Sequence, residues 1–412
     1  MQILHDTCCG IDVHAKTVVA CLIHQGRKQT KTFSTMTADL LKLLDWLTEA
    51  GCRIIAIEST GVYWRPVFNI LEGQIEVMLV NARHVKAVPG RKTDVKDCEW
   101  LADLLRHGLL KPSFIPPLEI RELRELTRYR QSLIREQATV SNRVQKLAES
   151  GNIKLSQVAS EALGVSGRRM LRALANGETD VEKMSQLART RLRKRLPELK
   201  QALEGRLTRA QRWVLGQLLD RYAELERSIE KVNAEIAREV ASCRDPFVQE
   251  ALELLDSIPG IGDAVAQVIV SEIGVKMEQF GSAQRLASWA GMCPGNNESA
   301  GKRKSGKTTK GSQYLRAALV QAAWAASRKK DSYLQAQYRR LVKRMSKNKA
   351  LVAVGHSILV MIYHVLSRRQ SYHELGGDYF DRQNVDRQKV RLIRKLESLG
   401  LKVTVEPIEA AA

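Results

Sequence analysis

The chain has 412 residues, 44% of them hydrophobic, so it can form about two or three domains with buried cores, and a disordered chain is excluded. Sixty-six Lys and Arg against 45 Asp and Glu leave a net charge of +21, which predicts a polyanionic partner. The seven cysteines show neither a C-x-x-C pair nor Cys/His ligand spacing. A disulfide framework and a zinc site are therefore not supported, and a reducing compartment is expected.

No segment of the chain is predicted to cross or enter a membrane. Residues 1–10 lack the apolar core of a secretion signal. The longest apolar stretch, Leu351–Leu366, is shorter than a bilayer requires and contains His356 and His364. We therefore expect a cytoplasmic, basic protein whose partner is nucleic acid rather than a membrane surface.

The first 115 residues alternate short β-rich runs with helical stretches and predict an α/β domain in the order βββαβαβα. The expected strands are Thr7–Val13, Thr17–Ile23, Gln29–Phe33, Arg53–Glu58 and Ile75–Asn81, and the expected helices are Thr37–Ala50, Val62–Leu71 and Thr93–His107. A Gln25-Gly26 turn separates the second strand from the third. Pro112, Pro116 and Pro117 then interrupt regular structure and place a boundary near residue 115.

Residues 116–245 are poor in Gly and Pro and rich in Leu, Arg, Glu and Ala, which favours helices. One coiled-coil seam is expected along Leu218, Tyr222, Leu225, Ile229, Val232 and Ile236, and a weaker one along Leu133, Val140, Val144 and Leu147. We predict two long antiparallel arms, with a small helical insertion at Gly151–Arg206 between them. An ordinary helical bundle core is the alternative.

The following region, residues 246–372, is predicted to be mainly helical. Two apolar helices, Val248–Ser257 and Asp263–Ile273, flank the turn Ile258–Gly262, as in a helix-hairpin-helix. Gly260 and Gly262 would let this turn approach a phosphate closely and leave backbone N–H groups free to bind it. A plain corner between two helices is the alternative.

Positive charge is concentrated just beyond this turn. Residues 299–350 contain fifteen Lys and Arg and one acid, Asp331. A solvated face normally mixes both signs of charge, so this segment is expected to bind phosphates and to release counterions when it does. The candidate phosphate contacts are Lys302, Arg303, Lys304, Lys307, Lys310 and Arg316.

Four carboxylates in the first domain are candidate metal ligands. Asp12 in the first strand and Glu58 at the end of the fourth each interrupt an apolar run, where an acid is costly unless it is paired or metal-bound. Adjacent parallel strands would bring these two side chains together. Asp94 and Asp97 lie three residues apart and share a helical face. Such oxygen ligands suit Mg²⁺ or Mn²⁺ in phosphodiester transfer, whereas ordinary solvated surface acids are the alternative.

Three blocks around these acids carry a family resemblance. Gly10–Val13, Ile57–Tyr63 and Arg91–Asp97 resemble the signature blocks of the DEDD-type insertion-sequence transposases, the bridge-RNA-guided serine recombinases. The resemblance implies a ribonuclease-H or RuvC-like fold for the first domain. It also implies that Asp12, Glu58, Asp94 and Asp97 are catalytic residues that chelate divalent metal.

The same family carries a serine nucleophile in its C-terminal domain, whose motifs resemble Ile258–Gly262 and the Ala-Gly-x-x-Pro turn Ala290–Pro294. The resemblance implies that Ser299 is the nucleophile. The family often has Ser-Gly where this chain has an alanine between Ser299 and Gly301, so Ser305 is a second candidate. A serine hydroxyl needs its proton removed and cations that stabilise charge on phosphorus, which Lys302, Arg303, Lys304 and Lys307 would supply.

Gly301–Thr308 also satisfies the Walker A pattern G-x-x-x-x-G-K-[ST]. A P-loop follows a buried strand and opens directly into a helix. Here a helical segment and a Pro-Gly loop precede the motif, and Thr309–Gly311 delays the next helix. Nucleotide hydrolysis is therefore not expected, although a cationic loop rich in N–H groups suits nucleic-acid phosphates.

Together these features predict a transposase or DNA recombinase of a mobile insertion element. Its expected parts are a metal-binding domain (1–115), helical arms (116–245), a serine domain (246–372) and a basic helical tail (373–412). The resemblance implies strand exchange through a covalent phosphoserine and a guide (bridge) RNA that pairs with donor and target DNA. It further implies dimers that assemble into a tetramer in the bacterial cytoplasm, at the nucleoid. The alternative functions are a hydrolytic RuvC-like Holliday-junction nuclease and a non-catalytic nucleic-acid scaffold.

Overall fold

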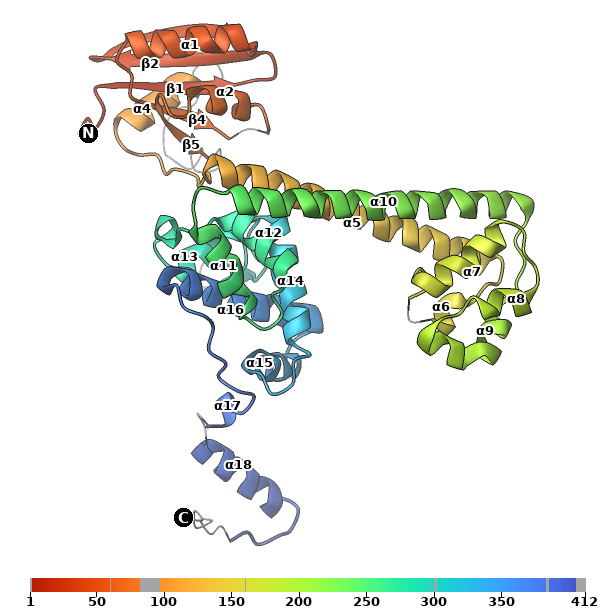
Figure 1. Cartoon of the computed structure of the whole chain (residues 1–412). Helices are drawn as coiled ribbons and strands as arrows, with labels where there is room; N and C mark the ends of the chain where they lie inside the picture. Colours follow the sequence, from red (N-terminus) through yellow and green to blue (C-terminus); the bar gives the residue numbers. More distant parts are fainter. Residues whose placement is uncertain are drawn as a thin grey trace. The chain divides into compact units, whose positions relative to one another are not determined.

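The computed structural model of the chain describes residues 2–59, 61–81, 97–159, 161–295, 297–299, 302–382 and 385–404. The chain divides into two compact units, residues 1–115 and residues 116–412. The first is built around a mixed sheet and the second is mostly helical (Figure 1). The prediction of an α/β region followed by mainly helical structure is confirmed.

The sheet of the first unit has the strand order β3-β2-β1-β4-β5. The strands are β1 (Thr7–Val13), β2 (Thr17–His24), β3 (Arg27–Ser34), β4 (Ile54–Glu58) and β5 (Glu76–Val80), and the described helices are α1 (Thr37–Glu49), α2 (Trp64–Leu71) and α4 (Asp97–Arg106). β1 pairs antiparallel with β2 and parallel with β4, and β4 pairs parallel with β5. Gln25 and Gly26 both have positive φ, so the predicted turn joins β2 to β3 as a tight hairpin.

Both faces of this sheet are covered, because the buried residues of the central strands alternate between two cores. Cys9, Ile11 and Val13 of β1 share one core with Leu40, Leu43 and Leu47 of α1 and with Val67 and Leu71 of α2. Cys8 and the residues Ile54 and Ala56 of β4 belong to the other, against α4. Successive side chains of β1 and β4 point to opposite faces, so those that do not enter the first core lie on the face covered by α4.

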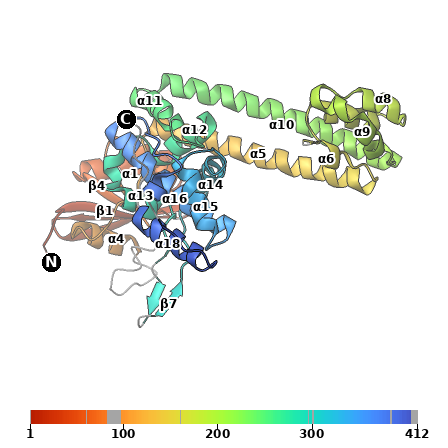
Figure 2. The same cartoon turned by 90° about the horizontal axis from the view of Figure 1, so that it is seen from below.

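Two long helices, α5 (Leu118–Ser150) and α10 (Arg209–Ser242), lie side by side in the second unit (Figures 1 and 2). They run antiparallel, because Gln211 contacts Ser150 at one end and Cys243 contacts Glu119 at the other. Leu225, Val232 and Ile236 of the expected seam are buried.

The seam is wrong toward the start of α10, where Leu218 and Tyr222 are only half-buried and Leu215 and Leu219 are buried instead. Helix α7 (Val165–Ala175) also packs on α10, which favours a different buried stripe. The pair of long helices is an observation, whereas its description as a coiled coil stays a prediction.

The segment between the two long helices, residues 151–208, folds as a small helical subdomain that we call the cap. Its helices are α6 (Leu155–Val158), α7, α8 (Val181–Gln186), the 3₁₀ helix η2 (Thr190–Arg195) and α9 (Leu196–Leu203). Met170, Leu171, Leu199 and Leu203 are among its buried residues, so the cap has an apolar core of its own. Figure 2 shows it at the end of α5 and α10 that is remote from α12.

Most of the remaining helices form a core around α16 (Lys347–Arg368), whose Val354, Ile358 and Ile362 are fully buried. The elements in contact with α16 are α11 (Phe247–Asp256), η3 (Met277–Phe280), α13 (Ala283–Trp289), α14 (Gln313–Ala326) and α15 (Tyr333–Val342). Helix α12 (Asp263–Ile273) packs on α11 and α14, α17 (Tyr379–Arg382) packs on α15, and α18 (Val385–Glu397) follows α17. Within the described residues, α16 alone is long and apolar enough to cross a membrane, and half of its most apolar window is buried inside the protein. A core helix of a soluble protein has the same composition, so this is weak evidence for a span.

One local expectation is wrong. The basic segment after Pro294 is expected from sequence to be a loop, but Asn297–Ser299 (β6) and Lys302–Ser305 (β7) form an antiparallel hairpin. Below it, Pro294 and Thr308 form a further antiparallel bridge. The short polar runs lack the apolar alternation that marks a strand in sequence, so the pairing gives no sequence signal.

Candidate functional site

Asp12 and Glu58 are brought together by the sheet register. Ile11 of β1 pairs with Ile57 of β4 in the parallel ladder, and each acid follows its isoleucine by one residue. Because Ile11 and Ile57 both point into the core under α1 and α2, Asp12 and Glu58 lie on the opposite face, beside α4. Both are half-buried, at the carboxyl ends of neighbouring strands. The two acids therefore share one face of neighbouring strands, and their convergence on a metal stays a prediction.

Asp97 is the first residue of α4, and α4 approaches the same end of β1. A Cβ at Gly10 would lie 2.2 Å from the carbonyl oxygen of Cys98, so the absence of a side chain at Gly10 allows the helix to pack directly on the strand. Burial raises the pKa of the Cys98 thiol to about 11, and the Asp12 carboxylate adds to that rise. Asp97, at the start of this helix, is half-buried. Asp94 lies outside the described residues.

His14 is a member of this site that sequence analysis missed. Its Nε2 lies 3.2 Å from Oδ2 of Asp12, whose side chain is 24% exposed. The sequence carries a weak signal, since His14 follows Asp12 by two residues and points to the same side of the chain. Within the described part of the chain, no group of three or more His, Cys, Asp or Glu side chains is arranged to hold a metal. Asp12 and Glu58 are nevertheless hard oxygen donors on one face, a donor set that fits Mg²⁺ or Mn²⁺.

Ser299 is the last residue of β6 and pairs with Lys302, the first residue of β7. The predicted nucleophile therefore sits beside the turn of the hairpin, on the strand opposite the cations Lys302, Arg303 and Lys304. Ser305 pairs with Asn297 at the other end of the ladder. Only the backbone of these residues is described. The Walker A pattern falls on this hairpin rather than on a strand–loop–helix, in agreement with the expectation that it is not a P-loop.

The base of the hairpin is held by close backbone packing and one side chain. Gly291, in the Ala-Gly-x-x-Pro turn, has φ of +68°, and a Cβ there would meet Gly311 N and Thr309 O at 2.7 Å. Arg316 Nη1 donates to Thr308 Oγ1 at 2.7 Å. Arg316, predicted as a phosphate contact, thus braces the hairpin in this structure.

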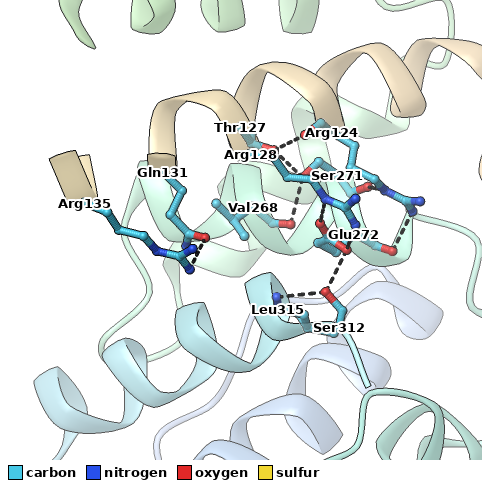
Figure 3. Close-up of polar contacts among 10 residues, drawn as sticks. All are labelled: Arg124, Thr127, Arg128, Gln131, Arg135, Val268, Ser271, Glu272, Ser312 and Leu315. Carbon is cyan, nitrogen blue, oxygen red and sulfur yellow. Dashed lines mark hydrogen bonds and ion pairs between the residues drawn. The ribbon is translucent and has the colours of Figure 1, made fainter. Parts of the chain in front are cut away.

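The chain leaving the hairpin enters α14 through a buried polar network (Figure 3). Ser312 caps α14 by accepting from Leu315 N, and its hydroxyl donates to Glu272 Oε2 at 2.9 Å. Arg128 of α5 donates from Nε to Oε1 of Glu272 at 2.7 Å and from Nη2 to Oε2 at 2.9 Å. Only 1% of Glu272 is exposed.

Two further contacts strengthen this junction. Arg124 Nε and Nη2 donate to the carbonyl oxygens of Ser271 and Glu272, each at 2.8 Å. The guanidinium of Arg128 also lies 4.6 Å from the ring centre of Tyr314. Sequence analysis missed Glu272, because an acid within the apolar helix α12 gives no indication of its partner on a helix 144 residues earlier.

The remaining predicted nucleic-acid residues have different environments. A Cβ at Gly260 would lie 2.2 Å from Ala322 O, so this glycine lets the turn pack on α14 rather than on a ligand. Sequence analysis expected Gly260 to allow a close approach to a phosphate, whereas in the structure it allows a close approach to α14. Gly262 is exposed, with no heavy atom within 4 Å of the position a Cβ would take, and the role proposed for it stays a prediction. Lys307 and Lys310 are exposed beside the hairpin.

Comparisons with known proteins point to one family. Residues 9–152 match a family model of DEDD transposases of the IS110 type, and residues 252–339 match the model described as transposase IS116/IS110/IS902 family. The chain is also similar to the transposase for insertion sequence element IS1111A of Coxiella burnetii (strain RSA 493 / Nine Mile phase I). The two are 21% identical over 390 residues, which cover 88% of this chain and 90% of that protein. The matched segments contain both the acid residues and the serine hairpin.

Proposed function

The chain belongs to the IS110-type family of DEDD transposases, enzymes of insertion elements that cut and join DNA, and on this premise we propose that it does so by metal-dependent phosphoryl transfer. The observation that supports this proposal is the parallel pairing of Ile11 with Ile57, because the acids that follow them, Asp12 and Glu58, then lie on the face of the sheet that α4 covers. Asp12, Glu58 and Asp97, with Asp94, would hold Mg²⁺ or Mn²⁺. When bound, such a cation would stabilise the negative charge that develops on a phosphodiester.

We assign the nucleophile to Ser299. Attack by its Oγ would form a Ser–O–P bond and break the bond from phosphorus to the 3′ oxygen, which takes up a proton as the serine hydroxyl loses one. The phosphodiester energy would be conserved in the protein–DNA ester, so a second 3′ hydroxyl would reseal the strand without ATP. Lys302 and Arg303, across the hairpin, would stabilise the anionic transition state.

The remaining finer assignments are supported by charge and by family membership. The segment 299–350, with fifteen cations, would bind the DNA backbone, and the exposed Gly262 turn would add backbone N–H contacts as in a helix-hairpin-helix. A bridge RNA that pairs with donor and target DNA is proposed from the family. The same holds for dimers that assemble into a tetramer and place one subunit's acids beside another's serine. We also propose the four domains 1–115, 116–245, 246–372 and 373–412, with the long helices as a coiled coil, and action in the cytoplasm.

A covalent-adduct assay with the element's end DNA tests this chemistry. The parent protein should cut DNA in Mg²⁺ and become attached to it, whereas Ser299→Ala should lose the adduct and strand exchange. The matched control Ser305→Ala, in the same hairpin, should keep both. Asp12→Asn should bind DNA but lose cleavage by a factor of about 10² or more.

Each alternative function predicts a different result in the same assay. A Holliday-junction nuclease that uses water would cleave normally as Ser299→Ala and never attach to DNA. A non-catalytic scaffold would show no Mg²⁺-dependent cleavage in the parent. RNA that co-purifies with the protein and is complementary to the element's ends would support the guide, and DNA exchange by RNA-free protein would contradict it.

A further inference from the structure

The cap contains a cavity of about 590 Å³ between η2 and the start of α7. Its lining includes Gly164, the N-cap of α7, and Ser166 of α7. Arg189, Arg191 and Arg195 also line it. Arg189 N donates to Ser166 Oγ at 2.9 Å, which joins the two walls. Arg195 donates to Val158 O at 2.7 Å and pairs with Glu198. The walls are therefore fixed by internal contacts, while the other two arginines of the lining are left to face solvent.

Four cations near this cavity form no ion pair with an acid among the described residues. Arg189, Arg191, Arg193 and Lys194 are all exposed, and no ion pair to any of them is found within the described residues. Several other cations of the cap are neutralised locally: Lys154 pairs with Glu149, Arg168 with Glu226, Arg172 with Asp220 and Lys200 with Glu182. Unpaired like charges within six residues of one another repel, so an external anion would stabilise them.

The dimensions favour a polymer over a small anion. As a 3₁₀ helix, η2 rises about 2 Å per residue, so the cations from Arg189 to Arg195 extend over roughly 12 Å. One strand of a nucleic-acid duplex presents about three phosphates over that length. The start of α7 at the same cavity adds the positive end of a helix dipole. Glu161 is the one acid among the described lining residues.

We propose that Arg189, Arg191, Arg193 and Lys194, which we call the arginine edge, bind the phosphate backbone of a nucleic acid. The edge lies outside both family matches, which end at residue 152 and resume at 252. It is carried at the end of the long helices remote from α12 and would give the enzyme a second, sequence-independent hold on its substrate (Figure 2). The class of ligand rests on the proposed function, whereas the site itself rests on the geometry of the cap.

The test uses the full-length chain and two fluorescent probes of random sequence, a DNA duplex and an RNA duplex, in salt titrations. The edge variant combines Arg189→Gln, Arg191→Gln and Arg193→Gln. We expect the affinity of this variant to fall at least about tenfold near physiological salt. The slope of log K plotted against log salt concentration should become shallower by about two to three, because each lost phosphate contact reduces it by roughly 0.9. The larger loss with one probe identifies DNA or RNA as the source of the phosphates.

A matched control removes the same charge from three exposed cations of α10 that form no ion pair within the described part of the chain: Arg209→Gln, Arg227→Gln and Lys231→Gln. It should lose less than about threefold. Equal losses in the two triple variants, or parent-like binding of both probes by the edge variant, would overturn the proposal. If the triple edge variant unfolds, Arg191→Gln alone, compared with Arg191→Lys, makes the same test on a smaller scale.

The result is separable from the proposed chemistry. The edge variant should still form the Ser299 adduct at low salt, because its metal and serine residues are intact. A parent that binds both probes but never forms an adduct would reject the serine mechanism and leave the arginine edge supported. If the parent forms the adduct and the edge variant binds both probes as well as the parent, the serine mechanism is supported and the arginine edge is rejected.

Discussion

The carboxylate of Glu272 and the guanidinium of Arg128 form a two-point ion pair between α12 and α5, with N–O distances of 2.7 and 2.9 Å (Figure 3). The same carboxylate accepts from Ser312, the N-cap of the helix that follows the serine hairpin. One buried acid thus joins a long helix, the domain core and the exit of the candidate nucleophile's hairpin. Displacing it should affect stability and hairpin position together.

Glu272→Gln should lower the free energy of unfolding by roughly 2–4 kcal/mol, because the amide leaves a largely buried guanidinium without its charge partner. Chemical denaturation of the full chain measures this loss. Glu278→Gln, an exposed glutamate on η3, is the control and should change stability by less than about 0.5 kcal/mol. A Glu272→Gln protein as stable as this control would show that the network contributes nothing.

Gly10→Ala should destabilise the first unit by about 3 kcal/mol or more, since its Cβ would overlap backbone atoms of Cys98 and Ala102 that cannot move independently of α4. Gly73→Ala, which places the same methyl group in open space at φ of +84°, should cost only about 1–2 kcal/mol. Thermal unfolding of the two variants makes the comparison. An equal effect in both would mean that α4 does not pack on β1 this closely.

Mg²⁺ or Mn²⁺ should raise the melting temperature of the protein, by a stabilisation of about 1–3 kcal/mol at saturating metal. Asp12→Asn should abolish that increase, and without metal it should melt no lower than the parent, because one of two neighbouring like charges is removed. Asp45→Asn, an exposed acid on α1, should keep the full metal response. A normal metal response in Asp12→Asn would move the metal site elsewhere.

The thiols should divide into two classes toward an alkylating reagent at mildly alkaline pH. Burial raises the pKa of Cys8 to about 12 and those of Cys52 and Cys98 to about 11, so these thiols stay protonated and unreactive. Cys243 and Cys293 are half-buried and should react first, and mass spectrometry of the native protein will locate the label. Rapid labelling of Cys98 in folded protein would contradict the close contact between α4 and the sheet.

Much of the local structure was predictable because its causes are local. Some elements carry their sequence signal within a few residues. These are the Gln25-Gly26 turn, the apolar run of β4 and the glycines at the two ends of α12. The expected seam of α10 failed at Leu218 and Tyr222, because the position of α7 is not encoded within α10 itself. The strands β6 and β7 were missed because their short polar runs lack the apolar alternation that marks a strand in sequence.

By itself the sequence determined the chain's positive charge, its α/β then helical order, and four acids and a serine in the order of one transposase family. Only the tertiary structure decided which residues meet. The pairing of Ile11 with Ile57 puts the acids that follow them on one face of the sheet. Gly260 packs on α14, and Glu272 contacts Arg128, 144 residues away in the sequence. Periodicity and composition report the environment that a residue requires, whereas a contact between distant residues depends on how whole helices and strands are arranged in three dimensions.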